Sequence, residues 1–221
     1  MPADIAGIRI VFEDEDIIVV DKPAGLLTIA TETEREKTLY AWLRKRANQK
    51  KLAQRIFIVH RLDREASGLV VFAKSIEAKQ GLQEQFKSHS AGRRYCAVVE
   101  GRVEESDFSI RSYLSENAAY RVYSTRKKGA GKLAVTHVHV VRRNRRNTVL
   151  QVRLETGRKH QIRVHLAEKG HPIVGDKIYG SGWNPIRRLA LHGEHLGFTH
   201  PRTGKRLEFE SKYPKLFDAI L

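Results

Sequence analysis

One aspartate set among cations, Asp63, is the residue whose type and spacing best suit it to chemistry. It lies in a polar segment at residues 60–68, where the only other carboxylate is Glu65. Arg61 and Arg64 are its near neighbours, and nearby positive charge favours the ionised form of a carboxylate. An ionised aspartate in a loop is able to act as a nucleophile or as an electrostatic partner. The simpler interpretation is a turn residue that caps its own backbone.

Short apolar runs on both sides of this segment must position Asp63. Residues 56–59 and 69–73 are rich in β-branched or aromatic types, and both are predicted to be buried strands. Farther upstream, residues 8–12 and 17–20 predict a hairpin. A bend follows at residues 21–27, where a proline lacks an amide donor and a glycine tolerates positive φ.

The rest of the chain alternates between helical and extended patterns. Helices are predicted from Thr38, after Ser75 and over residues 158–169, the last closed by a glycine. Further strands are predicted at residues 93–101, 132–141, 148–154, 189–192, 196–199 and 206–209. The strands at 132–141 and 148–154 form a hairpin with a polar turn at 142–147. The fold class is therefore α+β with a mixed sheet.

Net charge is the strongest compositional signal. The 221 residues carry a formal charge of +16, and no acidic residue lies between Glu116 and Glu155. A run of one sign this long repels itself, which favours a polyanionic partner such as nucleic acid over a membrane surface or simple solubility. The basic residues of this interval are Arg121, Arg126, Lys127, Lys128, Lys132, Arg142, Arg143, Arg145, Arg146 and Arg153.

Several strings occur together in an order that identifies a family. They are KPAGL at residues 22–26, HRLD at 60–63 followed by SGL at 67–69, RYCAVVEG at 94–101 and GRKHQIRVH at 157–165. Together they resemble the motifs of the RluA-type pseudouridine synthases, and the resemblance covers nearly all of the chain. It implies a pseudouridine synthase fold, with a central, mostly antiparallel mixed sheet flanked by helices and loops.

The resemblance also implies roles for individual residues. Asp63 would be the catalytic carboxylate in the isomerisation of uridine to pseudouridine in RNA. Tyr95 would line the uracil pocket, and Arg163 would pair with Asp63 and keep it charged. Arg61 would enter the RNA helix where the uridine leaves the stack. An apolar wall would come from Leu191 or, as the alternative, from Leu189.

On chemistry alone, simpler interpretations of two of these residues stay open. Tyr95 would otherwise be a strand tyrosine packed in the core, and Arg163 a surface arginine on a helix. We expect the basic turn to contribute to RNA binding through four residues: Arg142, Arg143, Arg145 and Arg146.

No cofactor is expected, because the reaction needs neither a redox step nor an external group. No metal site is expected either, since the histidines lack a ligand-type spacing and Cys96 is the only cysteine. We expect the histidines to make structural hydrogen bonds or to touch RNA. Two alternatives remain: a non-catalytic RNA-binding protein of the same fold, and a nuclease using Asp63. The nuclease would need additional carboxylates for a metal-assisted mechanism.

The expected organisation is a single catalytic domain over residues 1–221, with two lobes around a central cleft. The small RNA-binding domain that many relatives carry ahead of it is not expected. The expected partner is a stem-loop of ribosomal or transfer RNA, with no obligate protein partner and a monomeric state. No stretch approaches the length of a membrane helix and the first residues lack a signal pattern, so the cytoplasm is the expected compartment.

Overall fold

The computed structural model describes residues 7–49, 55–125, 127 and 129–220. Arg126 and Lys128 of the basic interval and the first six residues, including those considered for a signal pattern, lie outside these ranges. The chain forms two compact units. The first unit comprises Met1–Gly92 and Gly193–Lys212, and the second comprises Arg93–His192 and Tyr213–Leu221.

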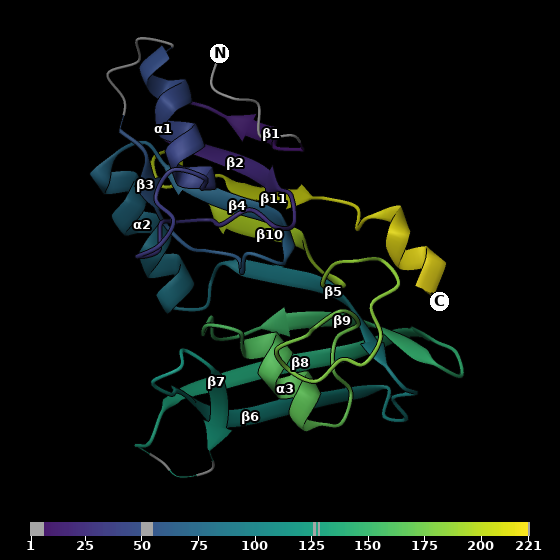
Figure 1. The fold of residues 1–221 in the computed structure, drawn as a ribbon. Coiled ribbons are helices and arrows are strands. Elements are labelled where there is room, and N and C mark those ends of the chain that lie inside the picture. Colours follow the sequence, from purple (N-terminus) through teal and green to yellow (C-terminus); the bar gives the residue numbers. More distant parts are fainter. Residues whose placement is uncertain (1–6, 50–54, 126, 128, 221) are drawn as a thin grey trace. The chain divides into compact units, whose positions relative to one another are not determined.

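The first unit is built on a sheet in which the neighbouring strands run in the order β1-β2-β4-β10, with β3 also paired to β4 and β11 to β10 (Figure 1). The strands are β1 (Arg9–Glu13), β2 (Ile17–Lys22), β3 (Phe57–Ile58), β4 (Ser67–Ala73), β10 (Leu191–Thr199) and β11 (Arg206–Glu210). The first two residues of β10, Leu191 and His192, are assigned to the second unit. All seven residues of β4 are buried, as its apolar sequence predicts. The predicted hairpin of β1 and β2 is confirmed.

One continuous strand, β10, replaces the two separate strands predicted at residues 189–192 and 196–199. The prediction broke the strand near Gly193, but that glycine serves a close approach of two backbones. A Cβ added to Gly68 of β4 would lie 2.3 Å from the Gly193 carbonyl oxygen. The prediction was wrong because a glycine that permits backbone contact has the same sequence signature as one that ends a strand.

Two helices complete the first unit, and the sequence located both. Helix α1 (Leu39–Gln49) begins after Thr38, whose hydroxyl accepts the Ala41 amide at 3.0 Å. Helix α2 (Ile76–Lys87) begins after Ser75, whose hydroxyl accepts the Ala78 amide at 3.0 Å. The buried face of α2 packs on a core of Ile17, Val19, Leu69, Val71, Leu196 and Phe198.

The second unit is an antiparallel sheet with the strand order β5-β9-β8-β6-β7. The strands are β5 (Gly92–Glu100), β6 (Asp107–Glu116), β7 (Val122–Thr125), β8 (Lys132–Arg143) and β9 (Asn147–Leu154). The predicted β8–β9 hairpin is confirmed. Strands β6 and β7 were not predicted, although Phe108, Ile110 and Leu114 alternate with polar residues along β6.

Helix α3 (Gln161–Glu168) packs against β7 and β8 (Figure 1). It begins three residues later than predicted, because His160 adopts a left-handed φ of 53° and residues 158–160 form a turn. A short 3-10 helix, η1 (Lys215–Ile220), lies at the end of the unit and buries Phe217. In the described ranges, each helix is too short or too polar to cross a lipid bilayer.

Candidate active site

Asp63 lies in an irregular segment between β3 and β4 of the first unit. The two strands pair antiparallel, with Phe57 opposite Ala73 and Ile58 opposite Phe72, so they fix both ends of the segment. Asp63 itself is partly buried, and Arg61 is exposed. The local sequence thus places a carboxylate at the edge of a buried sheet with its backbone anchored.

A second segment, residues 22–28, fixes the backbone next to Asp63 on both sides. The Thr28 hydroxyl donates to the Leu62 carbonyl at 2.8 Å and accepts the Leu62 amide at 3.2 Å. The Gly25 amide donates to the Arg64 carbonyl at 2.8 Å, and the Arg64 Nε returns a bond to the Gly25 carbonyl at 3.2 Å. Gly25 has a φ of 85°, which confirms the predicted turn.

Lys22 extends this support with a fully buried ammonium group. Its Nζ donates to the Ala66 carbonyl at 2.7 Å, the Leu26 carbonyl at 2.8 Å and the Pro23 carbonyl at 2.9 Å. A buried lysine is tolerated only when its charge is well solvated by such oxygens. Sequence reasoning treated residues 21–27 as a bend alone, and it did not single out Lys22 or Thr28. A lysine directly after an apolar strand was the available signal.

His60 makes a structural hydrogen bond, which is one of the two roles expected for the histidines. Its Nε2 accepts the Val71 amide at 3.1 Å, which places the ring proton on Nδ1. Its ring centre lies 4.7 Å from that of Phe86 on α2. The side chain three residues before Asp63 is therefore held against β4.

Arg163 lies in the second unit and is almost fully buried. Its Nε donates to Oδ2 of Asp176 at 2.7 Å and its Nη2 to Oδ1 at 2.8 Å, a two-pronged pair. This pair uses two of the five N–H groups of the guanidinium. The interpretation of Arg163 as a surface helix residue is wrong, and Asp176 is a partner that sequence reasoning did not name.

The other predicted pocket residues also lie in the second unit. Tyr95 is buried on β5, opposite Val152 of β9. Leu191 and Leu189 are 3% and 2% exposed. Arg61 and Asp63 belong to the first unit, so the joint action of the five residues stays a prediction.

A buried histidine, His165, lies on the same helix as Arg163. Its Nδ1 is 2.8 Å from the Thr136 hydroxyl and its Nε2 is 2.9 Å from the Ser112 hydroxyl. Burial lowers the pKa of His165 to about 4. The ring is therefore neutral at physiological pH, and its two hydroxyl partners link α3 to β6 and β8.

Strand β8 runs farther than predicted and includes two of the four arginines assigned to the turn. Arg142 and Arg143 pair with Val149 and Thr148 of β9, and the turn proper is residues 144–146. The bulge near Arg142 lets the strand continue past the end of its alternating pattern.

The four arginines differ in their surroundings. Arg143 donates to the Glu104 carbonyl at 3.0 Å, and Arg142 lies 3.5 Å from Asp218. Arg145 and Arg146 are exposed in the turn. The hairpin tip thus presents positive charge to solvent.

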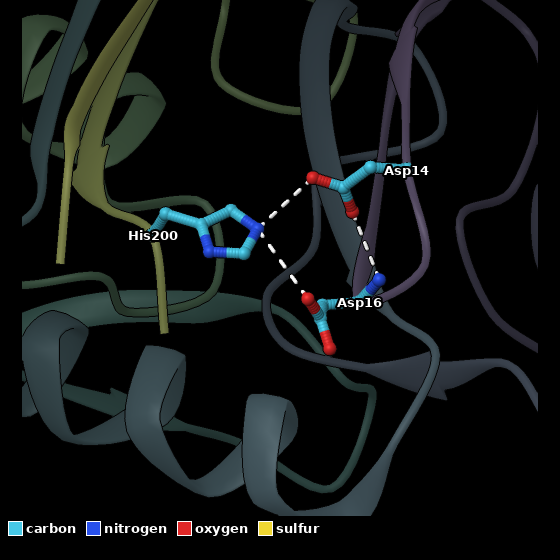
Figure 2. A group of neighbouring side chains, drawn as sticks. All are labelled: Asp14, Asp16 and His200. Atoms are coloured by element: carbon cyan, nitrogen blue, oxygen red, sulfur yellow. Dashed lines mark hydrogen bonds and ion pairs between the residues drawn. The ribbon is translucent and has the colours of Figure 1, made fainter. Parts of the chain in front are cut away.

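Asp14, Asp16 and His200 form a cluster in the first unit with a spacing that a metal ion would need. Figure 2 shows His200 Nε2 facing both carboxylates, at 3.0 Å from Asp14 and 3.7 Å from Asp16. The Nδ1 atom accepts the Arg202 and Thr203 amides at 3.3 and 3.1 Å, so the ring proton must be on Nε2. A nitrogen that donates a proton to Asp14 has no lone pair for a metal.

The charge of this cluster is also compensated within the protein. The Arg202 Nε lies 2.7 Å from Asp16. The cluster therefore ties the turn between β1 and β2 to the turn between β10 and β11 by hydrogen bonds and ion pairs, rather than forming a cation site.

Comparisons with known proteins match this chain to one family. The family model described as RNA pseudouridylate synthase matches residues 16–168. The ribosomal large subunit pseudouridine synthase D of Zymomonas mobilis is 37% identical over 97% of this chain and 71% of its own length. The protein of the same name from Neisseria meningitidis serogroup A is 38% identical over 94% of this chain and 59% of its own length. The chain thus spans 71% and 59% of the length of these two relatives.

A solved structure supports the fold. Human RNA pseudouridylate synthase domain containing 4 aligns with a TM-score of 0.76 and 24% identity, covering 95% of this chain and 90% of that one. The expected α+β pseudouridine synthase fold is confirmed. The resemblance drawn from the motifs at residues 60–63, 94–101 and 157–165 is confirmed as well, and the chain belongs to the RNA pseudouridylate synthase family, whose members isomerise uridine to pseudouridine in RNA.

Proposed function

We propose that this protein converts a specific uridine in an RNA stem-loop to pseudouridine, with Asp63 as the catalytic carboxylate. Membership of the family supports the reaction, and the names of the bacterial relatives favour large-subunit ribosomal RNA over transfer RNA as the substrate. In this isomerisation the bond from ribose C1′ to uracil N1 breaks and a bond from C1′ to C5 forms. The hydrogen of C5 is lost and N1 gains one, so atoms balance without a cofactor.

The observation that carries the proposal is the anchoring of the Asp63 backbone. Three hydrogen bonds fix the backbone on either side of Asp63. Their donors are Thr28, Gly25 and Lys22, and the acceptors are the carbonyls of Leu62, Arg64 and Ala66 respectively. A reacting group held in place in this way loses little freedom when substrate binds. The anchoring bonds involve the neighbouring backbone, which suits a carboxylate that must meet a substrate.

The remaining pocket residues have assigned roles in the proposal. Tyr95 would stack on the extruded uracil, and Leu191 would supply an apolar wall. Arg163 would keep Asp63 ionised. Arg61 would occupy the gap in the RNA helix that the uridine leaves, which offsets part of the few kcal/mol that base extrusion costs.

The exposed arginines of the β8–β9 hairpin would add affinity by binding phosphates. Neutralising Arg142, Arg143, Arg145 and Arg146 together should weaken RNA binding and flatten its salt dependence. On a duplex, the log–log slope should fall by about 0.9 for each phosphate that is no longer neutralised. An unchanged slope would show that this hairpin does not bind RNA.

The decisive experiment compares the wild-type protein with Asp63→Asn on an unmodified large-subunit ribosomal RNA transcript. Wild type should form pseudouridine at a discrete position, detected by chemical mapping. The asparagine variant should form none, yet bind the RNA with wild-type affinity. Turnover by Asp63→Asn would remove the residue from its role. Binding without turnover by the wild type, on this transcript and on transfer RNA, would favour the non-catalytic RNA-binding alternative.

We also propose that the protein acts as a monomer in the cytoplasm without an obligate protein partner. Purified protein alone should be sufficient for turnover in the transcript assay. Light scattering of the active sample should give the mass of one chain, and a dimer mass at working concentration would contradict the proposal.

A further inference from the structure

An exposed tyrosine stands at the turn between β6 and β7 in the second unit. The Tyr120 side chain is 67% exposed, and its backbone has a left-handed φ of 58°. The turn is fixed by Asn117, whose side-chain oxygen accepts the Ala119 and Arg121 amides, both at 3.0 Å. A glycine would adopt this backbone without strain, so a tyrosine here points to a use for its ring.

One cation lies over this ring, and a second follows it in the sequence. The Lys159 Nζ lies 5.6 Å from its centre and donates to the Tyr120 carbonyl at 3.2 Å. Lys159 also pairs with Glu116, the last acidic residue before the long basic interval. Arg121, the next residue along the chain, is exposed. We call Tyr120, Arg121 and Lys159 the Tyr120 platform.

The platform is continuous with the part of the second unit that holds Arg163. The Arg121 guanidinium lies 5.7 Å from the centre of the Tyr179 ring, and the Arg163 guanidinium lies 5.3 Å from the same ring. The Tyr179 hydroxyl accepts the Val122 amide at 3.3 Å, next to the turn. The buried ring of Tyr179 therefore connects the exposed platform to a residue of the proposed active site.

We propose that the Tyr120 platform binds an unpaired base of the substrate RNA other than the reacting uridine. The Tyr120 ring would stack on the base, and Arg121 and Lys159 would bind the adjoining phosphates. An exposed aromatic ring beside cations is how proteins hold single-stranded RNA, since every base has a face that stacks. The inference rests on the proposed function and adds a second point of recognition to it.

Charge favours RNA over a protein as the occupant. Within residues 117–154 all charged side chains are basic. Although Glu116 pairs with Lys159, the platform borders this all-basic interval, so it repels most basic protein surfaces and attracts phosphate.

The test measures binding of a fluorescently labelled RNA stem-loop with an unpaired loop, and of a blunt RNA duplex of similar length. Tyr120→Leu keeps an apolar side chain but removes the ring. It should weaken stem-loop binding about five- to 150-fold, the range of one stacked base, and leave duplex binding unchanged. Tyr120→Phe keeps the ring and should bind within about twofold of wild type.

A matched control comes from the same hairpin. Tyr123, on β7, is 46% exposed, and Tyr123→Leu should change stem-loop affinity by less than about twofold. Lys159→Met should lower the slope of log affinity against log salt by about 0.7, the value for one neutralised phosphate on a single strand. Circular dichroism and thermal melting of each variant establish that the fold is intact.

Three results would overturn the inference: wild-type stem-loop affinity for Tyr120→Leu, equal losses for Tyr120→Leu and Tyr120→Phe, or an equal loss on the duplex. The first would leave the ring as a candidate site for a protein partner. Pseudouridine formation by the same wild-type preparation is measured separately, on the large-subunit ribosomal RNA transcript and on transfer RNA. If the wild type forms pseudouridine but Tyr120→Leu binds the stem-loop with wild-type affinity, the platform alone is rejected. If the wild type forms no pseudouridine, the proposed function is rejected.

Discussion

The segment around Asp63 and the helix around Arg163 are held by opposite means. In the first unit, bonds from Thr28, Gly25 and Lys22 go to the backbone on either side of Asp63. In the second unit, the Asp176 carboxylate accepts two hydrogen bonds from the Arg163 side chain itself. In the proposed mechanism Asp63 would be positioned through its backbone, whereas the buried Arg163 guanidinium is positioned by the fixed counter-charge of Asp176.

The two arrangements should fail differently when they are disrupted. Removing one half of a buried ion pair leaves a charge in an apolar environment, which is costly. Removing a hydrogen bond to a loop backbone leaves an unsatisfied polar group and a looser loop. The first loss should appear mainly in stability and the second mainly in turnover.

Asp176→Asn should have the largest effect on stability. It removes the carboxylate from a buried Arg163 and should lower the free energy of unfolding by about 3–5 kcal/mol. Chemical denaturation measures this loss. Arg9 and Asp21 form a partly exposed pair at 3.0 Å, so Asp21→Asn is a control that should cost far less. Equal losses for both variants would contradict the importance of burial.

Lys22→Met should have the next largest effect, because the backbone carbonyls of Pro23, Leu26, Arg64 and Ala66 lose their donor while the apolar stem is kept. We expect a loss of about 2–4 kcal/mol in unfolding free energy, together with a lower kcat at unchanged KM. Lys74→Met provides the control, since Lys74 is a buried lysine of the same unit that binds Glu13 and the Asp14 carbonyl. That variant should lose stability without a matching loss of kcat. A kcat equal to wild type for Lys22→Met would remove Lys22 as a positioning residue.

Acid should weaken the second unit before the first. Burial lowers the pKa of His165 to about 4. Between pH 6.5 and 4 this histidine is therefore protonated in the unfolded chain and neutral in the folded chain. The stability that His165 contributes, about 3 kcal/mol, is therefore lost as pH falls from about 6.5 to about 4. In the first unit, hydrogen bonds from Arg46 lower the pKa of Glu13 to about 2, and the contribution of Glu13 is lost only as pH falls from about 4.5 towards 2.

Each unit carries one tryptophan, which makes this order measurable. Trp42 lies on α1 and Trp183 lies in the second unit. Fluorescence of the Trp42→Phe variant should report the earlier loss of stability, and that of the Trp183→Phe variant the later one. His165→Gln should flatten the dependence between pH 6.5 and 4. If stability in that range were unchanged by the substitution, His165 would not be its source.

Thr28→Val should have the smallest effect and the most specific one. It keeps the shape of the side chain but removes both bonds to Leu62, at a cost of about 1–2 kcal/mol in unfolding free energy. The expected signature is a reduced kcat with KM near wild type, because the Asp63 backbone is less well placed. Thr28→Ser retains the hydroxyl and should restore kcat. A serine variant as slow as the valine variant would show that the methyl group, not the hydroxyl, matters.

Local signals in the sequence were sufficient for several features. Helices α1 and α2 were predicted because Thr38 and Ser75 cap them and the apolar spacing follows. Strand β6 was missed because Ser112 interrupts the alternation that Phe108, Ile110 and Leu114 follow, and β7 because it is only four residues long. The end of β8 was misplaced because Arg142 and Arg143 resemble turn residues, although β9 pairs with them.

The sequence by itself determined the fold class, the family and the identity of Asp63 as the candidate acid, since each depends on residue types at short, fixed spacings. Only the tertiary structure decided that Asp176 binds Arg163 and that Lys22 and Thr28 hold the chain around Asp63. The reason is physical. A hydrogen bond between residues 13, 34 or 44 positions apart depends on where the folded backbone returns, and no local pattern encodes that path.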